Sequence, residues 1–189
     1  MKEKKRIKDL YENFFEIVLP RTDQRFGIVY APNEIVDFIL KSANWAIRNE
    51  LNIPECLSAD NVEILDPFTG TGTFIVRLIQ LGLNSPEKLE YKYKNELHAQ
   101  KILLVAYYIF HIIFLLSILK WLIILKKTDK NYEPFPGIIL TYTFTTRKEI
   151  TDQIGIFLQN DKRVDKINQK DITVIIGNSP YSVGQKKCK

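Results

Sequence analysis

Apolar side chains recur every three or four residues in two stretches near the start of the chain. The first stretch covers residues 3–19, and we expect it to form an amphipathic helix that ends at Pro20. The second is predicted to begin at Pro32 and to run to about residue 49, because a proline in the first turn followed by Glu34 is typical of a helix start. Both helices are expected to pack through their apolar faces.

Short apolar runs bounded by turn residues predict strands in the rest of the chain. The expected strands are 62–66, 91–97, 137–141 and 171–176, and the expected helices between them are about 74–82 and a segment from about Ala99 onward. Strands that alternate with helices favour a parallel sheet covered on both faces. We therefore predict an α/β fold with a doubly wound, mostly parallel sheet.

One apolar stretch fits this pattern less well. No charged residue occurs between Ile102 and Leu119, and after Lys120 the apolar run resumes as far as Leu125. That length and composition meet the threshold for a membrane-spanning helix. A buried core helix is the alternative interpretation.

Composition narrows the class of protein. The chain has 189 residues, of which 46% are hydrophobic and 26% are charged, so it can bury a core and is not a collagen-like, coiled-coil or disordered sequence. Its two cysteines, Cys56 and Cys188, stand far apart, which excludes a disulfide framework and a cysteine-rich zinc site and favours a reducing, cytoplasmic compartment. The net charge of +5 favours approach to a polyanion.

A glycine-containing loop follows the predicted strand 62–66 and has the sequence Asp66-Pro67-Phe68-Thr69-Gly70-Thr71-Gly72. It lacks the Gly-Lys-Ser/Thr ending of a triphosphate-binding loop, and Ile75 stands near the third glycine position of the dinucleotide motif. The carboxylate of Asp66 would repel a phosphate and attract a cation, while the glycines let a ligand approach the backbone. S-adenosylmethionine fits this description, and an ordinary turn between a strand and a helix is the alternative.

A second loop, Asn178-Ser179-Pro180-Tyr181, follows the predicted strand 171–176. The side-chain oxygen of Asn178 and the backbone carbonyl of Ser179 can each accept one hydrogen of an adenine amino group, and Pro180 stiffens that backbone. This arrangement turns the nitrogen lone pair toward a methyl donor, while Tyr181 stacks on the base. No metal is required, although a simple packing turn is again the alternative.

The two loops together resemble the motifs of adenine-N6 DNA methyltransferases. Longer stretches, among them LDPFTGTGTFIVRLIQ and VIIGNSPYSVGQ, are similar to the methylase portion of the large single-chain restriction-modification enzymes of type ISP. The resemblance implies a Rossmann-like methyltransferase that binds S-adenosylmethionine and acts on a flipped adenine in DNA, with further restriction-modification domains or subunits as partners. The cofactor-binding positions that it implies are Tyr30, Pro32, Asp66, Pro67, Phe68, Gly70, Gly72, Thr73 and Glu96.

The same resemblance divides the chain into a helix at 1–20 and a partial methyltransferase domain at 21–189, which we expect to be incomplete at its C-terminus. Three departures from the relatives stand out: Ser179 replaces a proline, Tyr142 replaces an acidic residue, and the apolar segment 110–125 replaces a more polar one. A disturbed reading frame would explain the segment 110–125, and this makes a membrane anchor at 102–125 the weaker interpretation. A non-catalytic remnant of the same fold stays open as an alternative.

Overall fold

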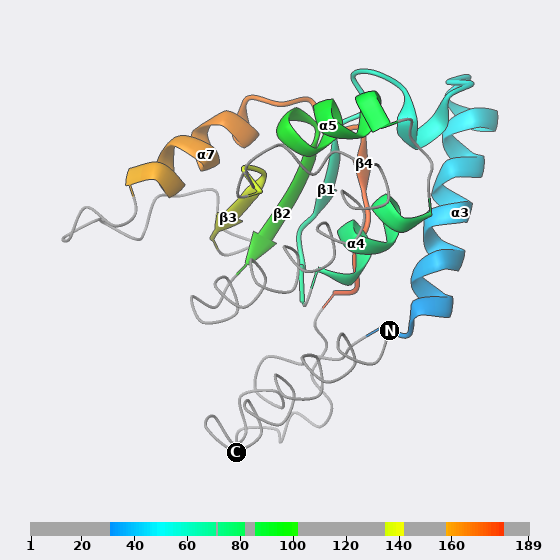
Figure 1. Cartoon of the computed structure of the whole chain (residues 1–189), viewed down its shortest axis with the longest axis horizontal. Helices are drawn as coiled ribbons and strands as arrows, with labels where there is room; N and C mark the ends of the chain where they lie inside the picture. The colour runs from blue at the N-terminus through cyan, green and yellow to red at the C-terminus, as the bar shows by residue number, and fades with distance from the viewer. Residues whose placement is uncertain (1–30, 71, 82–85, 102–134, 142–157, 180–189) are drawn as a thin grey trace, which may run out of the picture.

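The computed structural model describes residues 31–70, 72–81, 86–101, 135–141 and 158–179 (Figure 1). The helices within this part of the chain are α3 (Asn33–Glu50), the short 3-10 helix η1 (Cys56–Ser58), α4 (Thr73–Gln80), α5 (Pro86–Asn95) and α7 (Leu158–Asn168). The strands are β1 (Ile64–Asp66), β2 (Leu97–Lys101), β3 (Ile138–Leu140) and β4 (Val174–Ile175).

The four strands form one sheet in the order β3-β2-β1-β4, and every neighbouring pair is parallel. In the register of the sheet, Leu65 of β1 lies between His98 of β2 and Ile175 of β4. Parallel pairing brings all strand ends of one kind together, so the sheet has a carboxyl edge, where the strands end, and an amino edge, where they begin. The chain runs from β1 outward to β3 and then returns to the other side of β1, which confirms the doubly wound α/β prediction.

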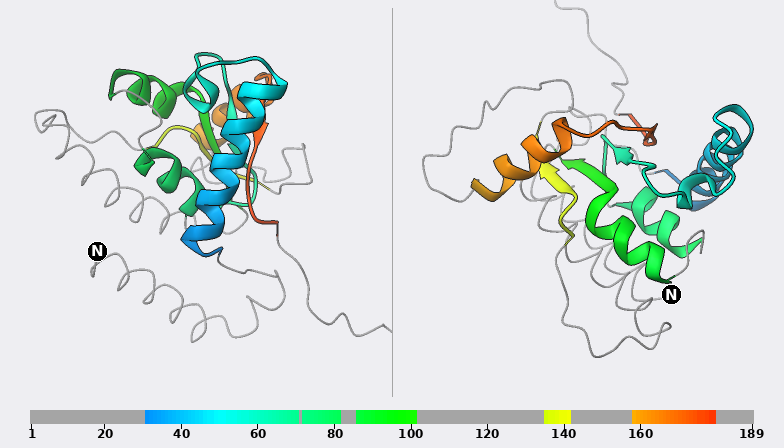
Figure 2. Two further views of the ribbon diagram at one scale, coloured as in Figure 1. Left: turned by 90° about the vertical axis from the view of Figure 1, so that its right-hand side faces the viewer. Right: turned by 90° about the horizontal axis from the view of Figure 1, so that it is seen from above.

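Helices cover both faces of this sheet (Figure 2). The face that carries Ile64, Leu97 and Ile138 packs against α3, α4 and α5, and these side chains belong to the main hydrophobic core. Helix α7 packs against β3 from the opposite face (Figure 2). A parallel sheet needs this double cover because neither of its faces is polar enough for water.

Helices α3 and α4 form where the sequence pattern predicts them. The carbonyl of Pro32 accepts hydrogen bonds from the backbone N–H groups of Ile35 and Val36, so α3 begins directly after that proline. The guanidinium of Arg77 on α4 binds the carboxylate of Asp37 on α3 through Nε and Nη2. This pair holds the pKa of Asp37 below its ordinary value and fixes α4 beside α3.

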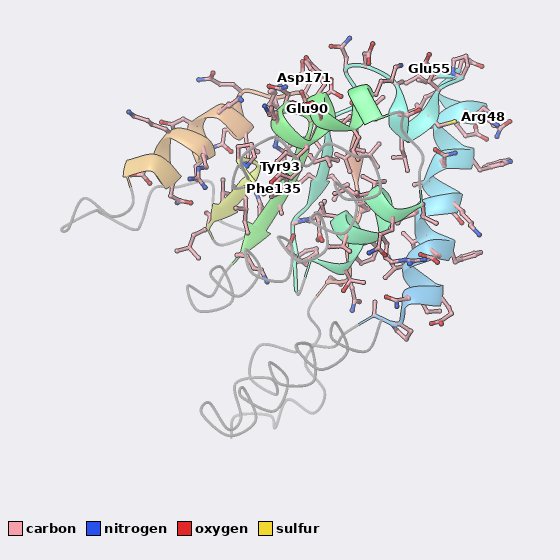
Figure 3. The ribbon with its side chains drawn as sticks, in the orientation of Figure 1. Arg48, Glu55, Glu90, Tyr93, Phe135 and Asp171 are labelled. Atoms are coloured by element: carbon pink, nitrogen blue, oxygen red, sulfur yellow. The ribbon has the colours of Figure 1, made fainter. Side chains whose placement is uncertain are left out.

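The prediction of a strand at 91–97 is wrong, and so is the expected helix start at Ala99, while the rest of that expected helix lies outside the described residues. Residues 91–95 belong to helix α5, and Ala99 lies within strand β2 rather than in a helix. Tyr93 of this helix packs its ring against Phe135 at a centroid distance of 5.2 Å (Figure 3). Aromatic residues favour strands only where a sheet face is available to them.

The sequence pattern did not predict strand β2, because several of its buried side chains are polar. The Nε2 atom of His98 lies 2.6 Å from Oε2 of Glu63, whose other oxygen accepts a hydrogen bond from Lys170 at 2.5 Å. Burial opposes ionisation of Glu63, but the hydrogen bonds from Lys170 and His98 outweigh it and hold the pKa of that carboxyl below its usual value. A strand whose buried positions carry polar side chains does not show an apolar pattern in sequence.

A side chain from α7 occupies the outer side of β3. Asn160 accepts a hydrogen bond from the backbone N–H of Leu140 at 2.7 Å and donates one to the carbonyl of the same residue at 3.0 Å. The amide group therefore satisfies the backbone of β3 in the way that a neighbouring strand would.

Candidate functional site

Asp66 is the last residue of β1, and its carboxylate is buried at the carboxyl edge with 1% of its surface exposed. One carboxylate oxygen accepts a hydrogen bond from the backbone N–H of Phe68 at 3.1 Å. Burial raises the pKa of Asp66 to about 7, although the bonds from Phe68 and Thr69 and the charge of Lys101 oppose that rise. With a pKa of about 7, the carboxyl of Asp66 is partly protonated at neutral pH, and a cation that reaches it would favour its ionised form.

The loop after Asp66 turns directly into helix α4. The hydroxyl of Thr69 donates a hydrogen bond to the backbone carbonyl of Asp66 at 2.8 Å and closes the turn. Gly72 precedes α4 with a φ of 79°, a conformation that glycine adopts without the steric cost that a side chain would add. Thr73 is the first residue of α4, so the loop passes directly from Gly72 into that helix.

The loop after β4 lies against the loop after β1. The backbone N–H of Ile176 donates to the carbonyl of Leu65 at 3.0 Å, and Gly177 follows. A Cβ atom added to Gly177 would lie 2.9 Å from Oδ1 of Asp66 and 3.5 Å from side-chain atoms of Phe68 and Pro67. Asn178, which is half-buried, and the exposed Ser179 therefore leave the sheet beside Asp66.

The junction of β1 and β4 is also where the strand order reverses. Ligands of doubly wound sheets bind at this switch point, outside the carboxyl ends of the strands. The structure thus brings Asp66 and Asn178, the first residues of the two loops singled out in the sequence, to the position where this architecture holds its ligands (Figure 1).

Glu96 lies elsewhere in the fold. It precedes β2 rather than following a strand, so it is at the amino edge of the sheet, opposite the edge that carries Asp66. Its carboxylate accepts hydrogen bonds from Lys92 Nζ at 2.5 Å and from the backbone N–H of Asn61 at 2.8 Å. The expected position of Glu96 at a strand end is therefore wrong, and its buried contacts are those of a structural residue.

Lys101 is the residue that does end β2, and sequence reasoning did not select it. Its side chain is buried, with 3% exposed, on the same sheet face as Asp66. Burial lowers the pKa of Lys101 to about 7, and the charge of Asp66 opposes that shift. In the sequence, Lys101 looks like a charged residue that flanks an apolar segment. Only the strand register shows that it lies at the carboxyl edge of the sheet.

Three of the predicted site residues, Tyr30, Pro180 and Tyr181, lie outside the described residues, as do Tyr142 and the segment 102–125. Pro32 is exposed at the start of α3. Among the helices of the described residues, none has the length and apolar character needed to cross a membrane.

The chemistry of the edge fits S-adenosylmethionine. Its donor set combines the buried carboxylate of Asp66, which matches a cationic group, with a turn at Gly72 that leaves no Cβ against a ligand. Lys101 adds a buried amino group, which in its charged form would match the carboxylate of the same cofactor. These residues would hold the amino-acid part of the cofactor at the carboxyl edge.

Comparison with known proteins gives structural relatives only. No family model and no curated protein matches the chain. A DrdV–DNA complex matches 97% of this chain with a TM-score of 0.81 and 33% identity. The ATP-dependent Type ISP restriction-modification enzyme LlaBIII bound to DNA matches 97% of this chain with a TM-score of 0.79 and 38% identity. A nuclease-deletion mutant of the Type ISP restriction-modification enzyme LlaGI, in complex with a DNA substrate mimic, also matches 97% of this chain, with a TM-score of 0.78 and 37% identity.

The chain is similar to a segment of Type ISP restriction-modification enzymes. It spans 17% of the DrdV chain, 12% of the LlaBIII chain and 14% of the LlaGI chain, so the similarity concerns one part of much larger proteins. The α/β fold and the restriction-modification context expected from the sequence agree with these matches.

Proposed function

We propose that this chain is the methyltransferase portion of a restriction-modification enzyme and that it methylates the N6 amino group of adenine in DNA. The observation that carries the proposal is the close approach of Gly177 to the carboxylate of Asp66, because it brings the loop with that carboxylate beside the loop with Asn178. Similarity to restriction-modification enzymes over 97% of the chain supports the same function.

Asn178 and Ser179 would position the target nitrogen. An adenine amino group is a poor nucleophile because its lone pair is delocalised into the ring. The side-chain oxygen of Asn178 and the backbone carbonyl of Ser179 accept one amino hydrogen each, which favours a pyramidal nitrogen with a localised lone pair. S-adenosylmethionine, when bound, supplies a methyl group activated by its sulfonium.

Asp66 would orient the donor from the opposite side of the junction. Its buried carboxylate accepts hydrogen bonds from a cationic group, and the turn around Gly72 lets the donor approach the backbone. Because the edge is buried around Asp66, the interaction acts in a medium with little water, where charge attraction is stronger than at an exposed surface.

DNA is the proposed substrate. All three structural relatives are described in complex with DNA or a DNA substrate mimic, and the net charge of +5 favours association with a polyanion. An adenine inside a duplex is inaccessible to this edge, so methylation would require the base to be flipped out.

The test is transfer of a labelled methyl group from S-adenosylmethionine to unmethylated DNA by the full chain. We expect labelled N6-methyladenine in digested DNA. Asn178→Ala should abolish transfer while cofactor binding, measured by calorimetry, is retained. Asn168→Ala, at the exposed end of α7, is the matched control and should transfer like the native chain.

Cofactor binding without any transfer by the native chain would contradict the proposed activity. It would favour a second candidate, a non-catalytic module that retains the cofactor site. The presence of Ser179 favours this candidate, since serine does not fix the backbone φ as the proline of the related methyltransferases would.

A further inference from the structure

Strand β4 lies beside β1 and leads directly into the loop with Asn178 (Figure 1). Apolar packing holds this segment only weakly. Ile175 has 66% of its surface exposed, Val174 is half-buried, and among residues 173–179 only Ile176 is buried. Because the register of a strand is strongly specified only where one of its faces is buried, apolar contacts alone leave the position of β4 along β1 weakly defined.

Glu63, the residue before β1, makes the polar contacts that hold the chain at the start of β4. Its backbone carbonyl accepts hydrogen bonds from the N–H groups of Thr173 and Val174, each at 3.0 Å. Its backbone N–H donates to the hydroxyl of Thr173 at 3.3 Å, and its carboxylate accepts from Nζ of Lys170 at 2.5 Å. The backbone and the side chain of one residue therefore anchor both ends of the segment 170–174.

Strand β2 holds the carboxylate of Glu63 in place. Its Oε2 atom lies 2.6 Å from Nε2 of His98, and the two side chains are 10% and 4% exposed. Since the carboxylate only accepts, Nε2 donates, and Nδ1 of His98 has no hydrogen-bond partner in the part of the chain that the structure describes. Within that part, the bond to Glu63 is thus the one hydrogen bond of the ring, and it leaves the other carboxylate oxygen directed at Lys170.

The anchor and the proposed site lie at opposite edges of the sheet. The ammonium of Lys170 donates to Glu63 and, at 3.4 Å, to the carbonyl of Asn95, both at the amino edge. Asn178 lies beside Asp66 at the carboxyl edge, and β4 connects the two edges. A slip of one residue would move an extended strand by about 3.3 Å, and misplacement of a reacting group by about 1 Å can cost about a hundredfold in rate.

We propose that Glu63 and Lys170 are positioning residues of the methyl-transfer site, which set the register of β4 on β1 and thereby the place of Asn178 relative to Asp66. The catalytic part of this inference rests on the proposed function, whereas the control of β4 does not. The two side chains act through the strand, since they lie at the edge opposite the site.

Amide hydrogen exchange of the full chain tests the control of β4 without an assay of activity. The reporters are the N–H groups of Val174 and Ile176, which bond to β1, and the reference is the N–H of Ala99 in β2. In Lys170→Met the charged hydrogen bond to Glu63 is lost, so both reporters should exchange about tenfold faster or more. Exchange at Ala99 should stay unchanged.

Methyl transfer to unmethylated DNA tests the consequence for the site. In Lys170→Met we expect kcat to fall by about tenfold or more, because Asn178 is displaced from the donor. The dissociation constant of S-adenosylmethionine, measured by calorimetry, should change by less than about twofold, since Asp66 belongs to β1. Thermal unfolding shows that the variant is folded at the assay temperature, so an unfolded fraction does not explain a lower kcat.

Two further variants are matched to Lys170→Met. Lys170→Arg keeps a cation beside Glu63 and should recover both the slow exchange of β4 and most of kcat. Lys162→Met removes an exposed lysine of α7 and should behave like the native chain in both measurements.

The outcomes separate this inference from the proposed function. Unchanged exchange at β4 in Lys170→Met overturns the inference, and so does an equal acceleration at Ala99, because the loss of stability is then global. Faster exchange at β4 with an unchanged kcat overturns the positioning role and leaves the proposed function supported. Absence of methyl transfer by the native chain contradicts the proposed function, whereas selective acceleration at β4 would still support the control of the strand by Lys170.

Discussion

Replacing Lys92 with methionine removes the group that joins α5 to the loop before β1 and to the start of β2. Lys92 has 1% of its side chain exposed and Glu96 has 2%, and the two are linked by a 2.5 Å hydrogen bond. Nζ also donates to the carbonyls of Ala59 at 2.5 Å and Val62 at 3.0 Å. In Lys92→Met the carboxylate of Glu96 stays buried without its cation, and both carbonyls lose a donor.

The expected loss of unfolding free energy in Lys92→Met follows from these contacts. Breaking a buried ion pair by removing one partner costs about 3–5 kcal/mol, because the remaining charge is left unpaired. The two carbonyls keep the total in the upper half of that range, at about 4–5 kcal/mol. Since a domain is stable by only about 5–15 kcal/mol, Lys92→Met should fold marginally. Its effect on the proposed binding of S-adenosylmethionine should be small, because the pair lies at the edge opposite Asp66.

Urea unfolding followed by circular dichroism measures this loss of unfolding free energy. The matched control is Lys94→Met, which removes the partner of Glu90 on the same helix. That pair is 3.5 Å long with side chains 40% and 35% exposed, and its loss should cost no more than about 0.5 kcal/mol. A cost below about 1 kcal/mol for Lys92→Met would refute the reasoning. In the double variant Lys92→Met/Glu96→Met the loss should be smaller than the sum of the single losses by about 2 kcal/mol.

Three further predictions concern other parts of the sheet. The raised pKa of Asp66 means that the folded state holds a proton which the unfolded state releases, so the contribution of this carboxyl to stability is lost as pH rises from about 4 to about 7. Asp66→Asn should therefore remove up to about 1.4 kcal/mol per pH unit from the slope of unfolding free energy against pH in that window. An unchanged slope would contradict the raised pKa of Asp66. Gly137→Ala should cost more than about 3 kcal/mol in urea unfolding, because the new Cβ would lie 1.9 Å from the carbonyl oxygen of Leu97 and overpacking of this kind is not relieved by a side-chain rotation. Asn160→Ala removes both hydrogen bonds to Leu140 and should lower thermal stability by about 1–3 kcal/mol, with retention of native stability as the contrary result.

Sequence patterns predicted the elements whose apolar side chains face the core. The strand before Asp66, the helix after Gly72 and the helix that begins behind Pro32 formed close to the expected positions. In each case apolar periodicity and a glycine or proline at the boundary indicated the same element. The meeting of the two loops also followed, since parallel strands place their carboxyl ends at one edge.

The wrong predictions come from polar residues that find partners across the sheet. Strand β2 contains His98 and Lys101, both buried, and neither contributes to an apolar pattern. The partner of His98 is Glu63, which is 35 residues away in sequence, so its burial is decided by tertiary contacts. Assigning residues 91–97 to a strand then moved Glu96 to the wrong edge and concealed Lys101.

The amide of Asn160 also decides where this sheet can be extended. Because it occupies the outward backbone groups of Leu140, an additional strand cannot pair beside β3 without displacing α7. Ile175 on the opposite border remains 66% exposed. Within the described part of the sheet, the border that is left for a further strand is therefore that of β4, beside the loop that carries Asn178.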